Sequence, residues 1–241
     1  MKLPIRITPC PIIESNLEIR FSSAYPEDAV IGIIYNVLQS QYKNCKLEQL
    51  PILQIPAEIR KHDVNLQNKP THIIHTEHFI VHIGPTVVVL GVPGSYPGWD
   101  KFLEVIKEFI DNLKTIKILN SINYIGLRFL NFFQLNVLEH INLKIDLCGD
   151  VSSNNGTIFR TELDKGGYVN VLQITNSVHV KNNAIDADGS LIDITTVLKH
   201  NMLSLDKCIE NINLAHDGEK QLFYSLLKED FLKTLNPQYR L

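Results

Sequence analysis

The sequence predicts an α+β fold made of two joined halves, each an antiparallel sheet with helices packed on one face. Short segments in which apolar and polar residues alternate indicate strands, and longer segments with apolar residues at helical spacing indicate helices. In each half a strand, some helix, several strands and further helix follow in that order, which favours helices segregated to one face of an antiparallel sheet. We place the halves at residues 1–118 and 119–241 and expect them to form one compact unit.

The first half is predicted to open with a strand and a helix. Leu17, Ile19 and Phe21 alternate with charged residues, which is typical of a half-buried strand. Pro26 and two acids then favour a helix start, and apolar residues recur at helical spacing through residues 27–43.

The rest of the first half alternates extended segments with loops. Residues 46–60 contain two prolines and are predicted to form an edge strand or an extended connection. Residues 71–92 are rich in Ile and Val and break at Gly84-Pro85, which predicts two strands joined by a hairpin. A second helix with a wide apolar face is predicted for residues 99–113.

The second half is predicted to begin with a central strand at residues 122–135, the most apolar part of the chain. Asp186 to Gly189 has the composition of a turn. We expect a helical turn at 137–140, strands at 141–147, 157–163, 168–180 and 191–197, and helices from a cap at Ser204 to residue 212 and over residues 218–235.

Composition narrows the class of protein. The 241 residues carry a formal net charge of −3, which argues against a dedicated nucleic-acid binder. The four cysteines (Cys10, Cys45, Cys148 and Cys208) form no C-x-x-C pair, so we expect reduced thiols and no zinc knuckle. The N-terminal residues lack the apolar core of a signal peptide, and we expect a soluble, cytoplasmic protein with no membrane association.

Two segments resemble catalytic or metal-binding motifs. Residues 71–82 contain four histidines and a glutamate, but in a strand His78 and His82 would lie roughly 13 Å apart, too far to share one ion. Residues 184–193 resemble the D-x-D-G-T nucleophile loop of haloacid-dehalogenase-type phosphatases, without the preceding apolar strand or the later acidic motif. We therefore expect no metal site, no cofactor and no phosphatase activity.

No other motif predicts an enzyme. The sequence contains no G-x-x-x-x-G-K-[ST], G-x-G-x-x-G or G-x-S-x-G pattern. His216, followed by Asp217, is a lone histidine near an expected helix start, where a surface or capping role competes with a functional one. We assign no catalytic residue, although an enzymatic role stays open.

Arg128 is the one charge in the apolar central strand, and an unpaired charge there would be costly. Glu14 is likewise surrounded by apolar residues near the first strand. We therefore predict an ion pair between Glu14 and Arg128 where the two halves meet. The pair could be structural, or Arg128 could hold an anionic ligand in a cleft with Asn131 and His216.

Several short blocks resemble a sporadically distributed family of uncharacterised bacterial proteins. They are Pro11-Ile-Ile-Glu14 with Leu17 to Phe21, Tyr96-Pro-Gly-Trp99, Gly126 to Asn131, Leu214-Ala-His216, and Leu235 to Tyr239. Phe129 stands where that family more often has Tyr. The resemblance implies a bacterial cytosolic protein but brings no established activity.

Two functions from different classes follow from these observations. The first is a non-enzymatic interaction or accessory protein with a protein partner, in a setting such as bacterial conflict or defence. The second is an enzyme or binding protein that holds a phosphate-bearing small molecule or nucleic acid in a cleft between the halves. We expect a protein partner rather than nucleic acid, and self-association is compatible with the sequence.

Overall fold

The computed structural model describes residues 3–144, 146–147, 150–151, 156–198 and 207–240. Cys148 and the expected helix cap Ser204 lie outside these residues. Nine of the described strands form one antiparallel sheet in the order β2-β3-β4-β5-β1-β6-β11-β10-β9, and β7 pairs only with β8. The α+β fold class is confirmed. The sequence pattern predicted one sheet for each half, whereas these nine strands belong to a single sheet.

The chain contains two compact units. The first unit consists of Met1–Glu14, Arg128–Val197 and Leu214–Leu241, and the second consists of Ser15–Leu127 and Leu198–Asn213. The halves predicted at 1–118 and 119–241 divide the chain differently and stay a prediction. None of the described helices is both long enough and apolar enough to cross a lipid bilayer.

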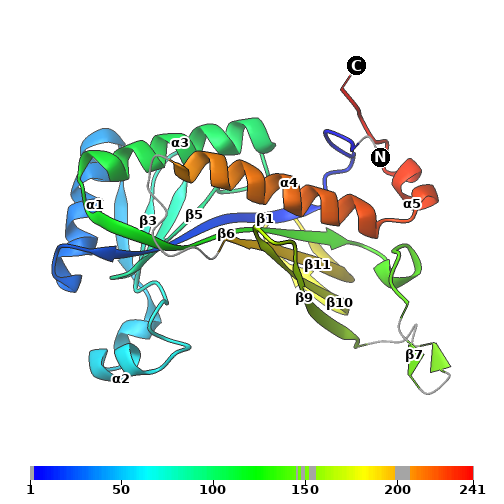
Figure 1. The fold of residues 1–241 in the computed structure, drawn as a ribbon, viewed down its shortest axis with the longest axis horizontal. Coiled ribbons are helices and arrows are strands. Elements are labelled where there is room, and N and C mark those ends of the chain that lie inside the picture. Colours follow the sequence, from blue (N-terminus) through cyan, green and yellow to red (C-terminus); the bar gives the residue numbers. More distant parts are fainter. Residues whose placement is uncertain (1–2, 145, 148–149, 152–155, 199–206, 241) are drawn as a thin grey trace. The chain divides into compact units, whose positions relative to one another are not determined.

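The second unit packs helices against short strands (Figure 1). Helix α3 illustrates why: Phe102, Ile106 and Phe109 recur on one face and are fully buried. Strand β1 pairs with β5 from Asn16 opposite Gly91 to Arg20 opposite Val87. The elements of this unit are β1 (Ile12–Ser23, from Ser15), α1 (Glu27–Gln41), β2 (Lys46–Gln49), the 3-10 helix η1 (Pro51–Gln54), α2 (Ala57–His62), β3 (His72–His75), β4 (Ile80–Ile83), β5 (Val87–Gly91), α3 (Trp99–Thr115) and the beginning of β6 (Leu119–Phe133).

The first unit packs its strands against helices from the end of the chain. Side chains of β10 and β11, including Ile174 and Ile192, form one apolar core with Phe223 of α4 and Phe231 of α5. Figure 1 shows α4 running along one face of these strands. The elements are the end of β6, η2 (Val137–Glu139), β7 (Asp146–Leu147), β8 (Asp150–Val151), β9 (Ile158–Asp164), β10 (Val169–Lys181), β11 (Asp186–Leu198), α4 (Cys208–Leu226, from Leu214) and α5 (Glu229–Thr234).

The structure keeps the predicted break at Gly84-Pro85 between β4 and β5, adds one turn that was not predicted, and places another turn differently. Residues 71–92 form three strands rather than two, because the Thr76 hydroxyl accepts the N–H groups of His78 and Phe79 and turns the chain between β3 and β4. Asp186 to Gly189 is not a turn but the start of β11. The turn lies earlier, where the Asn182 side chain accepts the N–H groups of Ala184 and Ile185 at 2.8 Å.

Two further elements depart from the prediction. Of the strand expected at 141–147, the described residues form an isolated bridge at Ile141 and the short strand β7. The helix expected to begin at Gly218 instead continues from Cys208 as α4. Gly218 fits inside this helix because the ring of Tyr168 occupies the space that a larger side chain would need.

Candidate functional site

Arg128 lies on the solvent-accessible face of β6, in the first unit. Burial alternates along the strand, so that Leu127 and Phe129 are buried while the Arg128 side chain keeps 35% of its surface exposed. Its Nη1 donates to Glu14 Oε1 at 2.9 Å, which confirms the predicted ion pair. Sequence reasoning missed the second and stronger partner, Asp193 of β11.

Asp193 binds Arg128 in a bidentate arrangement. Arg128 Nε donates to Asp193 Oδ1 at 2.8 Å, and Nη2 donates to Oδ2 at 2.7 Å. Planar fork-to-fork pairs of this kind are among the stronger polar contacts in proteins. The hydrogen bond to Asp193 raises the pKa of Arg128, partial burial opposes this, and the negative charges of Asp193 and Glu14 raise it further. All three guanidinium nitrogens therefore donate to carboxylates, and the two negative charges beside Arg128 would repel an anionic ligand.

This cluster is part of a longer line of polar side chains across the strands. Gln173 of β10 lies opposite both Asp193 of β11 and Arg160 of β9 in the strand register. Arg160 in turn contacts Glu162 on its own strand at 3.1 Å. We call Glu14, Arg128, Asp193, Gln173 and Arg160 the polar row. Its members are half-buried or exposed, whereas the residues on either side of Gln173 and Asp193 belong to the apolar core.

Asn131 and His216 lie on the opposite face of the strands from Arg128. Asn131 is 1% exposed and donates from Nδ2 to the Ile192 carbonyl oxygen at 3.2 Å. The His216 ring packs edge-on against Phe129, with ring centroids 6.2 Å apart. Burial, assisted by the charge of Lys220, lowers the pKa of His216 to about 3. The four candidate residues therefore do not form one site: Glu14 joins Arg128, while Asn131 and His216 belong to the packed face.

Glu219 of α4 is a buried carboxyl group that sequence reasoning also missed. It follows Ala215 at helical spacing on the buried side of α4 and is 7% exposed. Burial raises its pKa to about 8, so the carboxyl group is largely protonated at neutral pH. Glu219 could have been found from the sequence, because it is an acid at a position where the apolar stripe of the helix continues.

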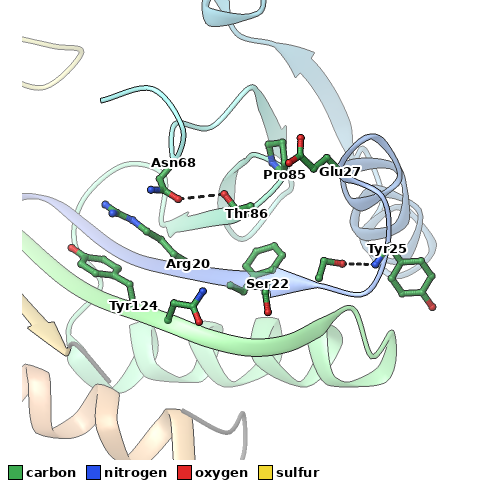
Figure 2. A pocket seen from close by; sticks show the side chains of 11 residues that line it. Arg20, Ser22, Tyr25, Glu27, Asn68, Pro85, Thr86 and Tyr124 are labelled. Carbon is green, nitrogen blue, oxygen red and sulfur yellow. Dashed lines mark hydrogen bonds between the residues drawn. The ribbon is translucent and has the colours of Figure 1, made fainter. Parts of the chain in front are cut away.

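The second unit contains a pocket of about 700 Å³ beside Arg20 of β1 (Figure 2). Arg20 Nε donates to Glu18 Oε1 at 2.5 Å, and its guanidinium carbon lies 4.2 Å from the centre of the Tyr124 ring. Figure 2 shows the guanidinium drawn between Asn68 and Tyr124. The lining comprises Arg20, Phe21, Ser22, Ser23, Tyr25, Glu27, Asn68, Pro85, Thr86, Asn123 and Tyr124.

Hydrogen bonds fix several polar groups of this pocket. Thr86 donates from its hydroxyl to Asn68 Oδ1 at 3.3 Å, and the Ser22 and Ser121 hydroxyls lie 2.7 Å apart. Ser121 also donates to Asn123 Oδ1 at 3.1 Å. Burial raises the pKa of Tyr124 to about 12, so the ring stays neutral under the guanidinium. The pocket was not predicted, because its residues come from separate segments of the chain.

The histidines of β3 and β4 are not gathered around a common point. His75 Nε2 lies 3.6 Å from Glu48 of the neighbouring strand, and Glu77 accepts a hydrogen bond from Asn44. In the part of the chain that the structure describes, no three His, Cys, Asp or Glu side chains are grouped closely enough to hold a metal ion.

Comparison with known proteins adds no family to this geometry. No protein-family model matches the sequence, and a search of curated proteins finds no match.

Proposed function

We propose that this chain is a non-enzymatic interaction protein that binds a protein partner through the polar row and the side chains around it. The observation that carries the proposal is the geometry at Arg128, where two carboxylates occupy all three guanidinium nitrogens. Charges held in this way are fixed before a partner arrives, so little side-chain entropy is lost on binding.

The composition of the surrounding surface supports recognition of a protein. Val171 and Leu191 lie half-buried on the same face of β10 and β11 as the polar row, and Ile158 of β9 is 68% exposed. Protein interfaces combine apolar area of this kind with hydrogen-bonded polar groups, and arginine is enriched in them. Fixed charges of both signs also make the surface selective for a complementary partner.

A second candidate is a binding protein for a phosphate-bearing small molecule. The pocket beside Arg20 favours it, because Arg20 uses only Nε in its hydrogen bond to Glu18. Arg128 does not favour it, since the carboxylates of Glu14 and Asp193 already offset its positive charge. Nucleic acid is the weaker form of this candidate because the chain has a net charge of −3.

We also propose the type of organism, the compartment and the general role of the protein. We infer a bacterial, cytoplasmic accessory protein of the sporadically distributed family that the sequence resembles, with a role in conflict or defence. Two joined halves at 1–118 and 119–241 are part of this proposal. It is supported by antiparallel strands and helices in both segments.

Affinity purification of the tagged chain from its native cell, followed by mass spectrometry, tests the proposal. The wild type should recover a protein partner at a stoichiometric level. Arg160→Glu should reduce that recovery at least tenfold, because it reverses an exposed charge of the polar row. Lys233→Glu is the matched control, since Lys233 is an exposed cation on α5. The proposal would be contradicted if Arg160→Glu and Lys233→Glu recovered equal amounts of the protein partner, or if the wild type recovered no stoichiometric protein.

A further inference from the structure

We propose that the pocket beside Arg20 binds the phosphate ester of a polyhydroxy small molecule, such as a sugar phosphate. The inference rests on the second candidate function and gives it a site and a ligand class. It does not depend on the polar row, whose residues are separate from the pocket lining.

Arg20 supplies the main anion-binding group. Its Nε is held by Glu18 and its face lies over Tyr124, which fixes the plane of the guanidinium. Among the described residues, Glu18 is the only hydrogen-bond acceptor of Arg20. The Nη1 and Nη2 groups therefore keep their donors, and two donors in one plane match two oxygens of a phosphate group.

Two amide side chains add donors to the same pocket. Asn68 and Asn123 each use Oδ1 to accept a hydroxyl hydrogen bond, from Thr86 and Ser121 respectively. The accepted bonds orient each amide, so that its Nδ2 group is left to donate. Figure 2 shows the nitrogen of Asn68 on the side of the Arg20 guanidinium. Arginine and oriented amide donors together suit an oxyanion.

The remaining lining suits hydroxyl groups rather than an apolar body. Glu27 lies at the end of the pocket away from Arg20 in Figure 2, and its carboxylate contacts Lys61 at 3.2 Å. Glu27 can still accept hydrogen bonds from ligand hydroxyls, and the hydroxyl groups of Ser22 and Ser23 also belong to the lining. The volume of about 700 Å³ exceeds the need of a phosphate group alone and lies in the range of small-molecule sites.

Calorimetric titration of the whole chain with ribose 5-phosphate, inorganic phosphate and ribose tests the inference. Because Arg20 and Glu27 each have an oppositely charged partner, we expect a modest dissociation constant, on the order of 0.1–1 mM, for ribose 5-phosphate. Inorganic phosphate should bind more weakly, and ribose should give no measurable heat. Equal binding of ribose and ribose 5-phosphate, or no binding of ribose 5-phosphate at 10-fold above the expected range (~10 mM), overturns the inference.

Three variants locate the binding in this pocket. Arg20→Gln should weaken ribose 5-phosphate binding roughly 10- to 100-fold, the loss expected for charged hydrogen bonds. Asn68→Asp keeps the acceptor for Thr86 but replaces a donor by a negative charge, so it should also abolish binding while the fold is kept. Glu27→Gln should weaken the sugar phosphate without weakening inorganic phosphate.

Lys233→Gln is the control of equal charge change outside the pocket and should leave the dissociation constant unchanged. A thermal melt of each variant verifies that it is folded. If Arg20→Gln and Asn68→Asp bind ribose 5-phosphate like the wild type, the site lies elsewhere and the inference is wrong. Recovery of a protein partner in the affinity experiment is a separate readout, so the two proposals can fail independently.

Discussion

Arg128 is a charged side chain in an apolar strand, where a charge is energetically costly unless it is paired. Its two partners differ in geometry and exposure. Asp193 binds two guanidinium nitrogens and is 21% exposed, whereas Glu14 binds one nitrogen and is 46% exposed. The more buried, bidentate partner should contribute more to stability, because an exposed ion pair is screened by water.

Asp193→Asn should therefore destabilise the fold by about 1–3 kcal/mol, since it leaves the partly buried guanidinium with one carboxylate. Glu14→Gln should cost less than about 1 kcal/mol. Urea unfolding of both variants measures the difference. A larger loss for Glu14→Gln than for Asp193→Asn would contradict the assignment of Asp193 as the main partner.

Part of this cluster could be predicted from the sequence and part could not. Glu14 and Arg128 were recognisable because each is a charge among apolar neighbours. Asp193 alternates with Ile192 and Ile194, which places it on the face opposite the core, but no local pattern tells which strand lies beside it. His216 was grouped with Arg128 incorrectly, because the face of the sheet on which α4 packs is set by tertiary contacts.

Glu219 should make stability depend on pH. Its folded pKa of about 8 lies above the unfolded value of roughly 4.3, so the folded state holds one more proton between these pH values. The contribution of Glu219 to the free energy of unfolding is therefore greatest below the unfolded pKa and is lost as the pH rises through 8. The decrease should be about 2 kcal/mol between pH 6.5 and 8.

Urea unfolding of the wild type and Glu219→Gln at these two pH values tests this prediction. The variant should lose most of the slope, because glutamine has no proton to release. His216 contributes in the other direction, since its folded pKa of about 3 lies below the unfolded value and its contribution is lost as the pH falls below about 6.5. An unchanged slope in Glu219→Gln would show that Glu219 does not cause the effect.

At the scale of elements, two glycines are predicted to respond differently to substitution by alanine. One lies where two strands pack closely, and the other lies in a helix with free space around it. A Cβ atom at Gly189 of β11 would overlap the carbonyl oxygen of Phe133 in β6, whereas a Cβ atom at Gly32 of α1 would meet nothing within 4 Å. Gly189→Ala should destabilise by about 1–3 kcal/mol, because backbone must move. Gly32→Ala should stabilise by about 0.5–1 kcal/mol through helix propensity.

Thermal and urea unfolding of these two alanine variants compares one chemical change in two environments. We expect Gly189→Ala to lower the free energy of unfolding and Gly32→Ala to raise it. Stabilisation by Gly189→Ala would show that β11 does not approach β6 as closely as the structure places it.

The elements themselves were predicted best where the apolar pattern extended over a long segment of the chain. Residues 27–43 and 99–113 correspond closely to α1 and α3, and the strand expected at 122–135 lies largely within β6. Errors arose where turn chemistry was ambiguous. Asp186 to Gly189 has the composition of a turn, yet the Asn182 side chain forms the turn, and the sequence alone does not rank the two.

At the scale of the whole molecule, the two units have separate surfaces suited to different partners. The first unit presents the polar row, whose charges are already paired, beside exposed and half-buried apolar side chains. The second unit presents the Arg20 pocket, with donors that are not fully used. An interaction protein that also senses a small phosphorylated ligand would use both surfaces, and variants that affect one surface should spare the other.

Site-specific photo-cross-linking in the native cell tests most directly whether the polar row surface is an interface. A photoreactive residue at position 162 of β9 lies next to Arg160, and one at position 229 of α5 is a control on a helix that is at least as exposed. We predict a discrete cross-linked protein from position 162 and none from position 229. No cross-link from position 162, or the same product from both positions, would contradict the proposed function.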